Sequence, residues 1–382
     1  MRTVFVFFLV GLTTHVWAQN RPVEIPLPLP KQPKNIVLLI GDGMGLSQIT
    51  AGMVANGNIL QLERFSYVGF SKTFSADNIV TDSGAGATAL SIGRKANNGA
   101  IGVDADSAVY ETILESAKLA GKSTGLVATC AITHATPASF AAHHYERDSM
   151  EAIALDMSNA GVDLMIGGGR DYFENRKDNL NLLASMEDRG VQIIRTEESL
   201  FNIKQLPVAA LLWSDDALPK HKGRNDILPK ATYLALEKLS EDRDGFFLMV
   251  EGSQIDWGGH ANESEYIIQE MLDFDEAIGV AIDFAERNKE TLVIVTADHE
   301  TGGYAINGGN LIEKKIMPAF TTKKHTAVMV PVFAFGPGAE AFMGIQDNTQ
   351  LYEKMMTALD LQRKRKPVAW KNKAQFYAPI KR

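Results

Sequence analysis

Six short, continuous runs of apolar residues recur along the chain, and segments with helical periodicity separate them. Such runs are typical of strands that are buried on both faces of a parallel sheet, because a strand with one solvated face would alternate apolar and polar residues. The runs occupy residues 35–40, 124–128, 164–166, 246–250, 292–296 and 328–335, and the helical segments occupy residues 110–120, 149–159, 230–239 and 266–287. This alternation predicts an α/β fold with a large, mainly parallel central sheet and helices on both of its faces.

Chain length and composition agree with one large domain. The 382 residues are 45% hydrophobic and 22% charged, close to the average for globular proteins that bury a core. This length would also accommodate several average domains, but α/β enzymes built on one large sheet often exceed the usual domain size. We therefore predict a single catalytic domain over residues 35–382, preceded by a Pro-rich linker at residues 19–34.

Residues 1–18 have the layout of a secretory signal peptide. Arg2 precedes an apolar run over residues 4–12, and Ala18 stands at the expected cleavage site. The alternative is an N-terminal membrane anchor, but the apolar run is too short to span a bilayer. We expect an exported protein, periplasmic or secreted, without a membrane anchor after cleavage. Cys130 is the only cysteine, so an internal disulfide is excluded, and its position after the run 124–128 predicts a buried thiol at a strand end.

The formal charge of -8 argues against a nucleic-acid-binding protein, which would normally carry basic faces. It does not exclude a phosphate substrate, because bound divalent cations would reverse the sign of the local field. One basic run, Arg363-Lys364-Arg365-Lys366, stands near the C-terminus. A run this short is predicted to be a solvated surface segment rather than a polyanion-binding tail.

Candidate metal ligands follow three of the apolar runs. Asp42 follows the first, Glu251 follows the run at 246–250, and Asp298-His299 follows the run at 292–296. Parallel strands end at one edge of a sheet, so these carboxylates are expected to lie together. Taken singly, each would more often be a helix cap or a solvated turn residue. Taken together, they would repel one another strongly unless cations lay between them.

A second set of candidate ligands combines histidine with aspartate. Asp256 and His260 are four residues apart, a spacing that places both on one face of a helix, and His325 precedes the last apolar run. Imidazole together with carboxylate oxygen suits zinc, whereas a site with only oxygen ligands suits magnesium. The sequence therefore indicates more than one kind of metal site.

Ser83 is the candidate nucleophile. It stands between an acid and a run of small residues that is typical of the start of a helix, where unpaired backbone N–H groups favour a phosphoryl oxygen. The alternative is that Ser83 or Asp82 is only the N-cap of that helix. The residues around Ser83 do not form the Gly-x-Ser-x-Gly elbow of other serine hydrolases. Arg147 is the candidate clamp for two phosphoryl oxygens, with a surface ion pair as its alternative.

These segments, in this order, resemble the alkaline phosphatase family over residues 35–338. The shared motifs are Asp-Gly-Met-Gly, Thr-Asp-Ser-x-x-x-Ala-Thr-Ala, His-Ala-Thr-Pro, Glu-Gly-x-x-Ile-Asp-x-x-x-His, Thr-Ala-Asp-His-Glu and a late His-Thr. The resemblance implies one zinc held by Asp256, His260 and His325, a second zinc held by Asp42, Asp298 and His299 that also binds the Ser83 oxygen, and a magnesium held by Asp42, Thr136 and Glu251. His134 lies beside the magnesium in this comparison, Trp257 stands where other members have Lys or His, and Arg147 matches the family arginine that binds the phosphoryl group.

The resemblance also implies a reaction and an assembly. The reaction is hydrolysis of small phosphate monoesters to an alcohol and inorganic phosphate, through a phosphoseryl intermediate on Ser83, and the assembly is a homodimer. One alternative is a phosphodiesterase or sulfatase built on the same kind of metal scaffold. A second alternative, from another class, is a non-catalytic exported protein that binds phosphate or metal.

Overall fold

The computed structural model describes residues 32–373. The predicted signal peptide at 1–18 and nearly all of the predicted linker at 19–34 lie outside these residues. These described residues group into one compact unit. None of the helices between Gln32 and Lys373 combines the length and the apolar character needed to cross a bilayer.

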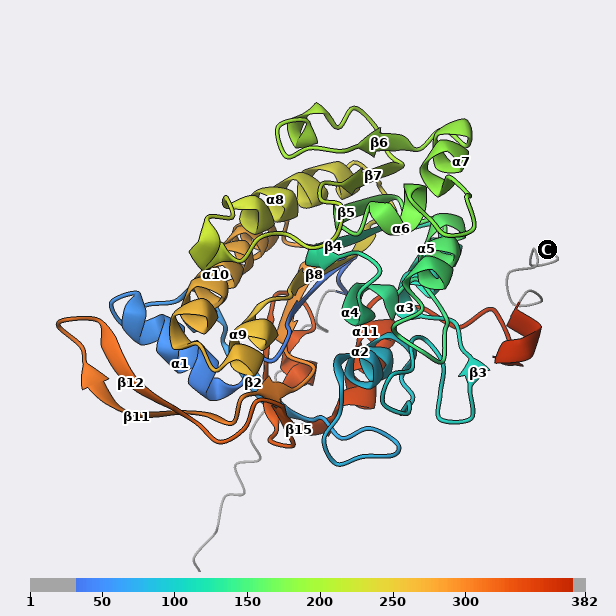
Figure 1. The fold of residues 1–382 in the computed structure, drawn as a ribbon. Helices are drawn as coiled ribbons and strands as arrows, with labels where there is room; N and C mark the ends of the chain where they lie inside the picture. The colour runs from blue at the N-terminus through green and yellow to red at the C-terminus, as the bar shows by residue number, and fades with distance from the viewer. Residues whose placement is uncertain (1–31, 374–382) are drawn as a thin grey trace, which may run out of the picture. The chain divides into compact units, whose positions relative to one another are not determined.

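A ten-stranded sheet forms the centre of this unit, in the order β15-β2-β14-β9-β1-β8-β4-β5-β7-β6 (Figure 1). Its strands are β1 (Asn35–Gly41), β2 (Tyr67–Lys72), β4 (Ser123–Ala131), β5 (Leu164–Gly168), β6 (Gln192–Ile194), β7 (Val208–Leu211), β8 (Phe246–Gly252), β9 (Thr291–Thr296), β14 (Val330–Phe335) and β15 (Gly344–Asp347). Within this sheet only β14 runs antiparallel to its neighbours, β9 and β2. The prediction of a large, mainly parallel sheet is confirmed.

Helices cover both faces of the sheet (Figure 1). One face carries α1 (Leu46–Ala55), α8 (Ile227–Leu239), α9 (Ile255–Ala261) and α10 (Ser264–Asn288), and the other carries α2 (Ser83–Ile92), α3 (Ile113–Leu119), α4 (Ala135–Ala138), α5 (Met150–Asn159), α6 (Asp171–Glu174), α7 (Leu182–Asp188) and α11 (Asn348–Ala358). Strand β1 supplies both cores: Ile36 and Leu38 pack on the side of α2 and α3, and Val37 and Leu39 on the side of α10. This double burial explains the continuous apolar runs.

Short elements complete the fold. Three two-stranded pairs join β10 (Glu300–Thr301) to β13 (His325–Thr326), β11 (Tyr304–Asn310) to β12 (Lys315–Phe320), and β3 (Ala108–Val109) to β16 (Val368–Ala369). The 3-10 helices are η1 (Gln61–Arg64), η2 (Leu200–Asn202), η3 (Lys220–Lys222), η4 (Ala339–Phe342) and η5 (Trp370–Asn372). The β10–β13 pair matters for the site, because it holds His325 against the segment that follows His299.

The basic run near the C-terminus corrects one prediction, because it is only partly solvated. The Arg363 guanidinium lies 4.6 Å from the centre of the Tyr352 ring and donates a hydrogen bond to the carbonyl of Ile92. The backbone N–H groups of Lys364 and Arg365 donate to the fully buried carboxylate of Glu111. A buried carboxylate needs such donors, and the chain supplies them here.

Candidate active site

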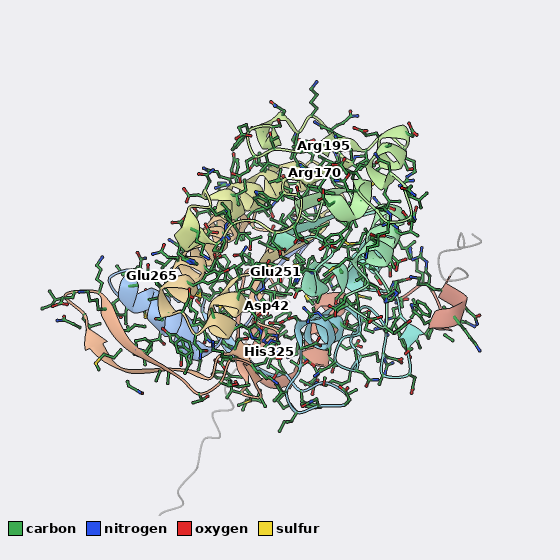
Figure 2. All side chains as sticks on the ribbon, in the orientation of Figure 1. Asp42, Arg170, Arg195, Glu251, Glu265 and His325 are labelled. Atoms are coloured by element: carbon green, nitrogen blue, oxygen red, sulfur yellow. The ribbon has the colours of Figure 1, made fainter. Side chains whose placement is uncertain are left out.

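Three adjacent strands deliver acidic side chains to one edge of the sheet. Asp42 directly follows β1, Glu251 is the penultimate residue of β8, and Asp298 follows β9 by two residues. Because β8 and β9 flank β1 and run parallel to it, the three carboxyl groups meet at the same edge. All three residues are at most 4% exposed. Figure 2 shows Asp42, Glu251 and His325 grouped together.

Burial and mutual repulsion make these acids hard to ionise. Burial raises the pKa of Asp42 well above its ordinary value, and the charges of Asp298, Asp256 and Glu251 raise it further. Burial also raises the pKa of Glu251 to about 7, and burial together with Asp256 raises the pKa of Asp298 to about 6. Such a group of acids is destabilising unless positive charge lies among them.

One histidine and carboxylate cluster is built by α9 and β13. Asp256 and His260 lie one helical turn apart, with Asp256 Oδ2 3.3 Å from His260 Nε2, and His325 Nε2 lies 3.4 Å from Asp256 Oδ1. The two Nε2 atoms are 3.1 Å apart. Each Nδ1 donates to a backbone carbonyl, that of Lys323 for His260 and that of Thr81 for His325. The outer nitrogens are thereby fixed, and both rings aim Nε2 at one point beside Asp256.

A second cluster combines Asp42, Asp298 and His299. The Nε2 atom of His299 lies 3.6 Å from Asp42 Oδ1 and 3.1 Å from Asp298 Oδ2. Asp298 Oδ1 accepts from the backbone N–H groups of Gly43 and His299, at 3.2 and 2.9 Å. Among the described residues, Asp42 Oδ1 and Asp298 Oδ2 are buried without a hydrogen-bond partner. These are the atoms of this cluster that a cation would satisfy.

Thr301 fixes the tautomer of His299. Its hydroxyl donates to Asp256 Oδ1, so its oxygen accepts from His299 Nδ1 at 3.3 Å. Burial, followed by the charge of His325, holds the pKa of His299 well below its ordinary value. The ring is therefore neutral, and its Nε2 lone pair faces the two carboxylates. Such an arrangement is repulsive by itself and matches the coordination of a metal ion.

A third group lies around Glu251. Its Oε2 atom accepts from Ser253 Oγ at 2.7 Å and from Cys130 Sγ at 3.2 Å. The Thr136 hydroxyl oxygen is buried and has no hydrogen-bond partner within residues 32–373. His134 precedes α4, with its ring centre 5.8 Å from that of Trp257. Burial, with help from the charge of Arg147, lowers the pKa of His134 to about 4, so this ring is also neutral near pH 7.

The start of α2 holds Ser83 and its neighbour Asp82. Asp82 is the N-cap and accepts from the backbone N–H of Ala85 at 2.9 Å, which leaves Ser83 as the first helical residue. The Ser83 Oγ atom lies 3.3 Å from His299 Nε2. Arg147 Nη1 donates to Asp82 Oδ2 at 2.9 Å, and its side chain is 24% exposed. Arg147 therefore stands beside the serine, and its ion pair lies within the site.

The comparisons with known proteins agree with one another. A family model described as alkaline phosphatase matches residues 33–318. Alkaline phosphatase 3 of Bacillus subtilis is 36% identical over 85% of this chain and 89% of its own length, and the alkaline phosphatase of Escherichia coli is 31% identical over 87% of each. The solved alkaline phosphatase of the Antarctic bacterium TAB5 is 43% identical, covers 87% of this chain and all of its own, and superposes with a TM-score of 0.84.

The chain belongs to the alkaline phosphatase family. It is thus an enzyme, a phosphoric monoester hydrolase that uses metal cofactors. A solved structure of a TAB5 variant, in which aspartate replaces one histidine, has Mg bound in the site named M3. One of the ligand groups predicted here, Asp42-Asp298-His299, has ligand atoms within 4.8 Å of one another. The same holds for Asp256, His299 and His325, a group that combines members of the two predicted zinc sets and does not include His260.

Several contacts of this alkaline phosphatase site were not found by sequence reasoning. They are the pairing of Asp82 with Arg147, the link from Thr301 to Asp256, and the donors Ser253 and Cys130 on Glu251. Thr301 stands two residues after His299, and Ser253 stands two residues after Glu251. This closeness in sequence to a predicted ligand was the only signal that could have pointed to them. The pairing of Asp82 with Arg147 spans 65 residues and left no signal in the sequence.

Proposed function

We propose that this enzyme hydrolyses small phosphate monoesters by double displacement, with Ser83 as the nucleophile at a site for two zinc ions and one magnesium ion. The observation that carries the proposal is the position of the Ser83 hydroxyl, 3.3 Å from His299 Nε2 and beside two buried carboxylate oxygens that lack hydrogen-bond partners. A hydroxyl in such a place becomes a nucleophile when cations compensate the carboxylates.

The donor sets suggest which ion each group would hold. Asp256, His260 and His325 would hold one zinc, and Asp42, Asp298 and His299 the second, because both sets combine imidazole with carboxylate. Asp42, Thr136 and Glu251 offer only oxygen and would hold magnesium. Bound cations would supply charge neutralisation, favouring the ionised form of Ser83 and balancing negative charge on the phosphoryl and leaving oxygens.

Ser83 and Arg147 would have different roles in the reaction. Ser83 Oγ forms the new bond to phosphorus as the ester P–O bond opposite to it breaks and the alcohol departs. Water then cleaves the phosphoserine and releases inorganic phosphate, which regenerates the serine. Arg147, oriented by Asp82, would bind two non-bridging oxygens of the phosphoryl group. Because little covalent chemistry falls to other side chains, positioning should dominate the rate.

The rival activities are a phosphodiesterase, a sulfatase and a non-catalytic binding protein. Arg147 favours a monoester dianion, because a diester has one oxygen fewer for the guanidinium to bind. The test combines metal content with rates on an aryl phosphate, its methyl diester and an aryl sulfate. We expect the monoester to react fastest, chelation to abolish the rate, and zinc plus magnesium to restore it. Equal rates after chelation would reject the metal site, and no turnover at all would favour a binding protein.

Export and dimer formation extend the proposal. The pattern of residues 1–18 supports export, and N-terminal sequencing of the mature protein would test cleavage after Ala18. A homodimer follows from the resemblance, and sedimentation measurements test it. The charge of -8 supports the absence of a nucleic-acid-binding surface, which a DNA-binding assay at low salt would check.

A further inference from the structure

A cavity of about 530 Å³ opens beside His260 and His325. Three histidines of the site form a row of contacts that starts at the proposed nucleophile. Ser83 lies next to His299, the rings of His299 and His325 stack at 3.6 Å, and His325 contacts His260. The cavity is lined by His260 and His325, at the end of this row, and also by Thr81 and Asp82, which directly precede Ser83. In an in-line displacement the leaving oxygen departs on the side opposite to the nucleophile, and His260 and His325, the histidines farther along the row from Ser83, form part of the cavity wall.

The size of the cavity fits more than a small alcohol. Its volume lies within the range of about 300–1,000 Å³ that is usual for small-molecule sites. A phosphoryl group bound between Ser83 and Arg147 would leave this space to the alcohol part of the ester. The lining of the cavity therefore contacts the part of the substrate that differs from one phosphate ester to another.

Of the charged side chains that line the cavity, Lys324 is the one whose charge is left to interact with a bound substrate. The acid of the lining, Asp82, already accepts from Arg147 and from the backbone N–H groups of Ala85 and Gly99. Lys324 is exposed, and its Nζ makes no ion pair with an acid of the described part of the chain. The rim of the cavity is thus positive where the alcohol part would project into solvent.

The backbone around Lys324 is held in place by the site itself. Its N–H donates to the Thr322 hydroxyl at 3.1 Å, and its carbonyl accepts from the N–H of Gly302 at 2.9 Å. The preceding carbonyl, that of Lys323, accepts from Nδ1 of His260 at 2.7 Å, and the following residue is His325. The point from which the Lys324 side chain starts is therefore fixed relative to two candidate zinc ligands.

We propose that this cavity receives the alcohol part of the substrate and that Lys324 selects phosphate monoesters whose alcohol part carries a second negative charge, a carboxylate or another phosphate. This inference rests on the proposed function, because it takes Ser83 as the nucleophile. It adds a specificity-determining residue and a substrate class.

Two esters that differ only in charge test the inference. 4-Carboxyphenyl phosphate is anionic on its alcohol part, and 4-carbamoylphenyl phosphate has nearly the same shape but is neutral there. The measured quantity is the ratio of their kcat/KM values. We expect Lys324→Gln to lower this ratio by about fivefold, mainly through KM, which is the size of effect that one exposed ion pair produces. Lys324→Glu should lower it further, and Lys324→Arg should retain it.

Lys323→Gln is the matched control, because it removes the same charge one residue away from a side chain that does not line the cavity. Its ratio should stay within about twofold of the wild type in physiological salt, where exposed charges are screened. A ratio unchanged by Lys324→Gln, or lowered equally by Lys323→Gln, would overturn the inference. Calorimetric binding of both esters to Ser83→Ala gives the same comparison without turnover, so failure of the Lys324 effect is distinguishable from failure of the proposed chemistry.

Discussion

The hydroxyl oxygen of Ser83 lies 3.3 Å from Nε2 of His299, and the same nitrogen faces Oδ1 of Asp42 and Oδ2 of Asp298. Helix α2 brings the serine to this point from one face of the sheet, while the three other residues come from the ends of β1 and β9. One position thus lies within reach of a hydroxyl, an imidazole and two carboxylates. This convergence explains why a plain serine, with no histidine base assigned to it, can serve as a nucleophile in the proposed reaction.

Replacement of Ser83 by alanine should lower kcat on an aryl phosphate by about 10³-fold or more, because the group that attacks phosphorus is lost. Zinc content should not change, since the proposed ligands remain. Ser91→Ala is the control: this serine is on the same helix, is fully buried and donates to the carbonyl of Thr88. Turnover by Ser83→Ala near that of Ser91→Ala would reject Ser83 as the nucleophile.

Arg147→Lys should lower kcat/KM by about 10- to 100-fold and weaken inhibition by inorganic phosphate, because an ammonium group cannot form the paired hydrogen bonds of a guanidinium. The measurements are steady-state kinetics and the inhibition constant of phosphate. Arg170→Lys is the control, since Arg170 pairs with Glu174 on α6, away from Asp42 in Figure 2. An unchanged inhibition constant in Arg147→Lys would contradict a role in phosphoryl binding.

The strands inside the fold could be predicted, because a strand that is buried on both faces is a continuous run of apolar residues in the sequence. All six apolar runs correspond to strands of the central sheet, although the last begins at Val330 rather than at residue 328. Three of the four strands that were missed lack such a run: β2 alternates buried residues with partly or fully exposed ones, β6 is only 3 residues long, and in the edge strand β15 Ile345 is 67% exposed. The fourth, β7, is a continuous and fully buried apolar run that the same criterion could have found.

Only the part of the site that follows from the order and direction of the strands could be predicted from the sequence. Parallel strands end at one edge, so Asp42, Glu251 and Asp298 were expected together, and the structure places them there. Side-chain direction and hydrogen-bond partners depend on segments distant in sequence. The contact between Ser253 Oγ and the backbone N–H of Thr129 joins residues 124 positions apart, and no periodicity encodes it.

Ser253 and Cys130 both donate to Oε2 of Glu251, which leaves Oε1 to turn toward the proposed magnesium position. Ser253→Ala should weaken magnesium binding by about tenfold, because ligands that lose an orienting hydrogen bond bind metal less tightly. Cys130→Ala should have a smaller effect, since a thiol is the weaker donor. Magnesium titration of the chelated enzyme, followed by metal analysis, measures both. Equal magnesium affinity in Ser253→Ala and wild type would refute this orienting role.

A buried pair away from the metal ligands gives a prediction about pH. His143 Nε2 lies 3.3 Å from Glu115 Oε2, and its Nδ1 donates to the carbonyl of Gly102 at 2.6 Å. Burial alone would lower the pKa of His143, but the charge and hydrogen bond of Glu115 raise it above the ordinary value of 6.5. A raised histidine pKa stabilises the fold fully below about pH 6.5, and this contribution is lost as the pH rises through the folded pKa.

Glu115→Gln removes the charge that holds the proton on His143 but keeps the cap of α3, because glutamine can still accept from the backbone N–H of Thr112 as Glu115 does at 3.0 Å. Urea unfolding of both proteins at about pH 6 and about pH 9 tests the pair. The free energy of unfolding of the wild type should fall more between these values than that of Glu115→Gln. Metal ligands titrate alike in both proteins, so the difference isolates the pair, and parallel pH profiles would show that His143 is neutral in the folded state.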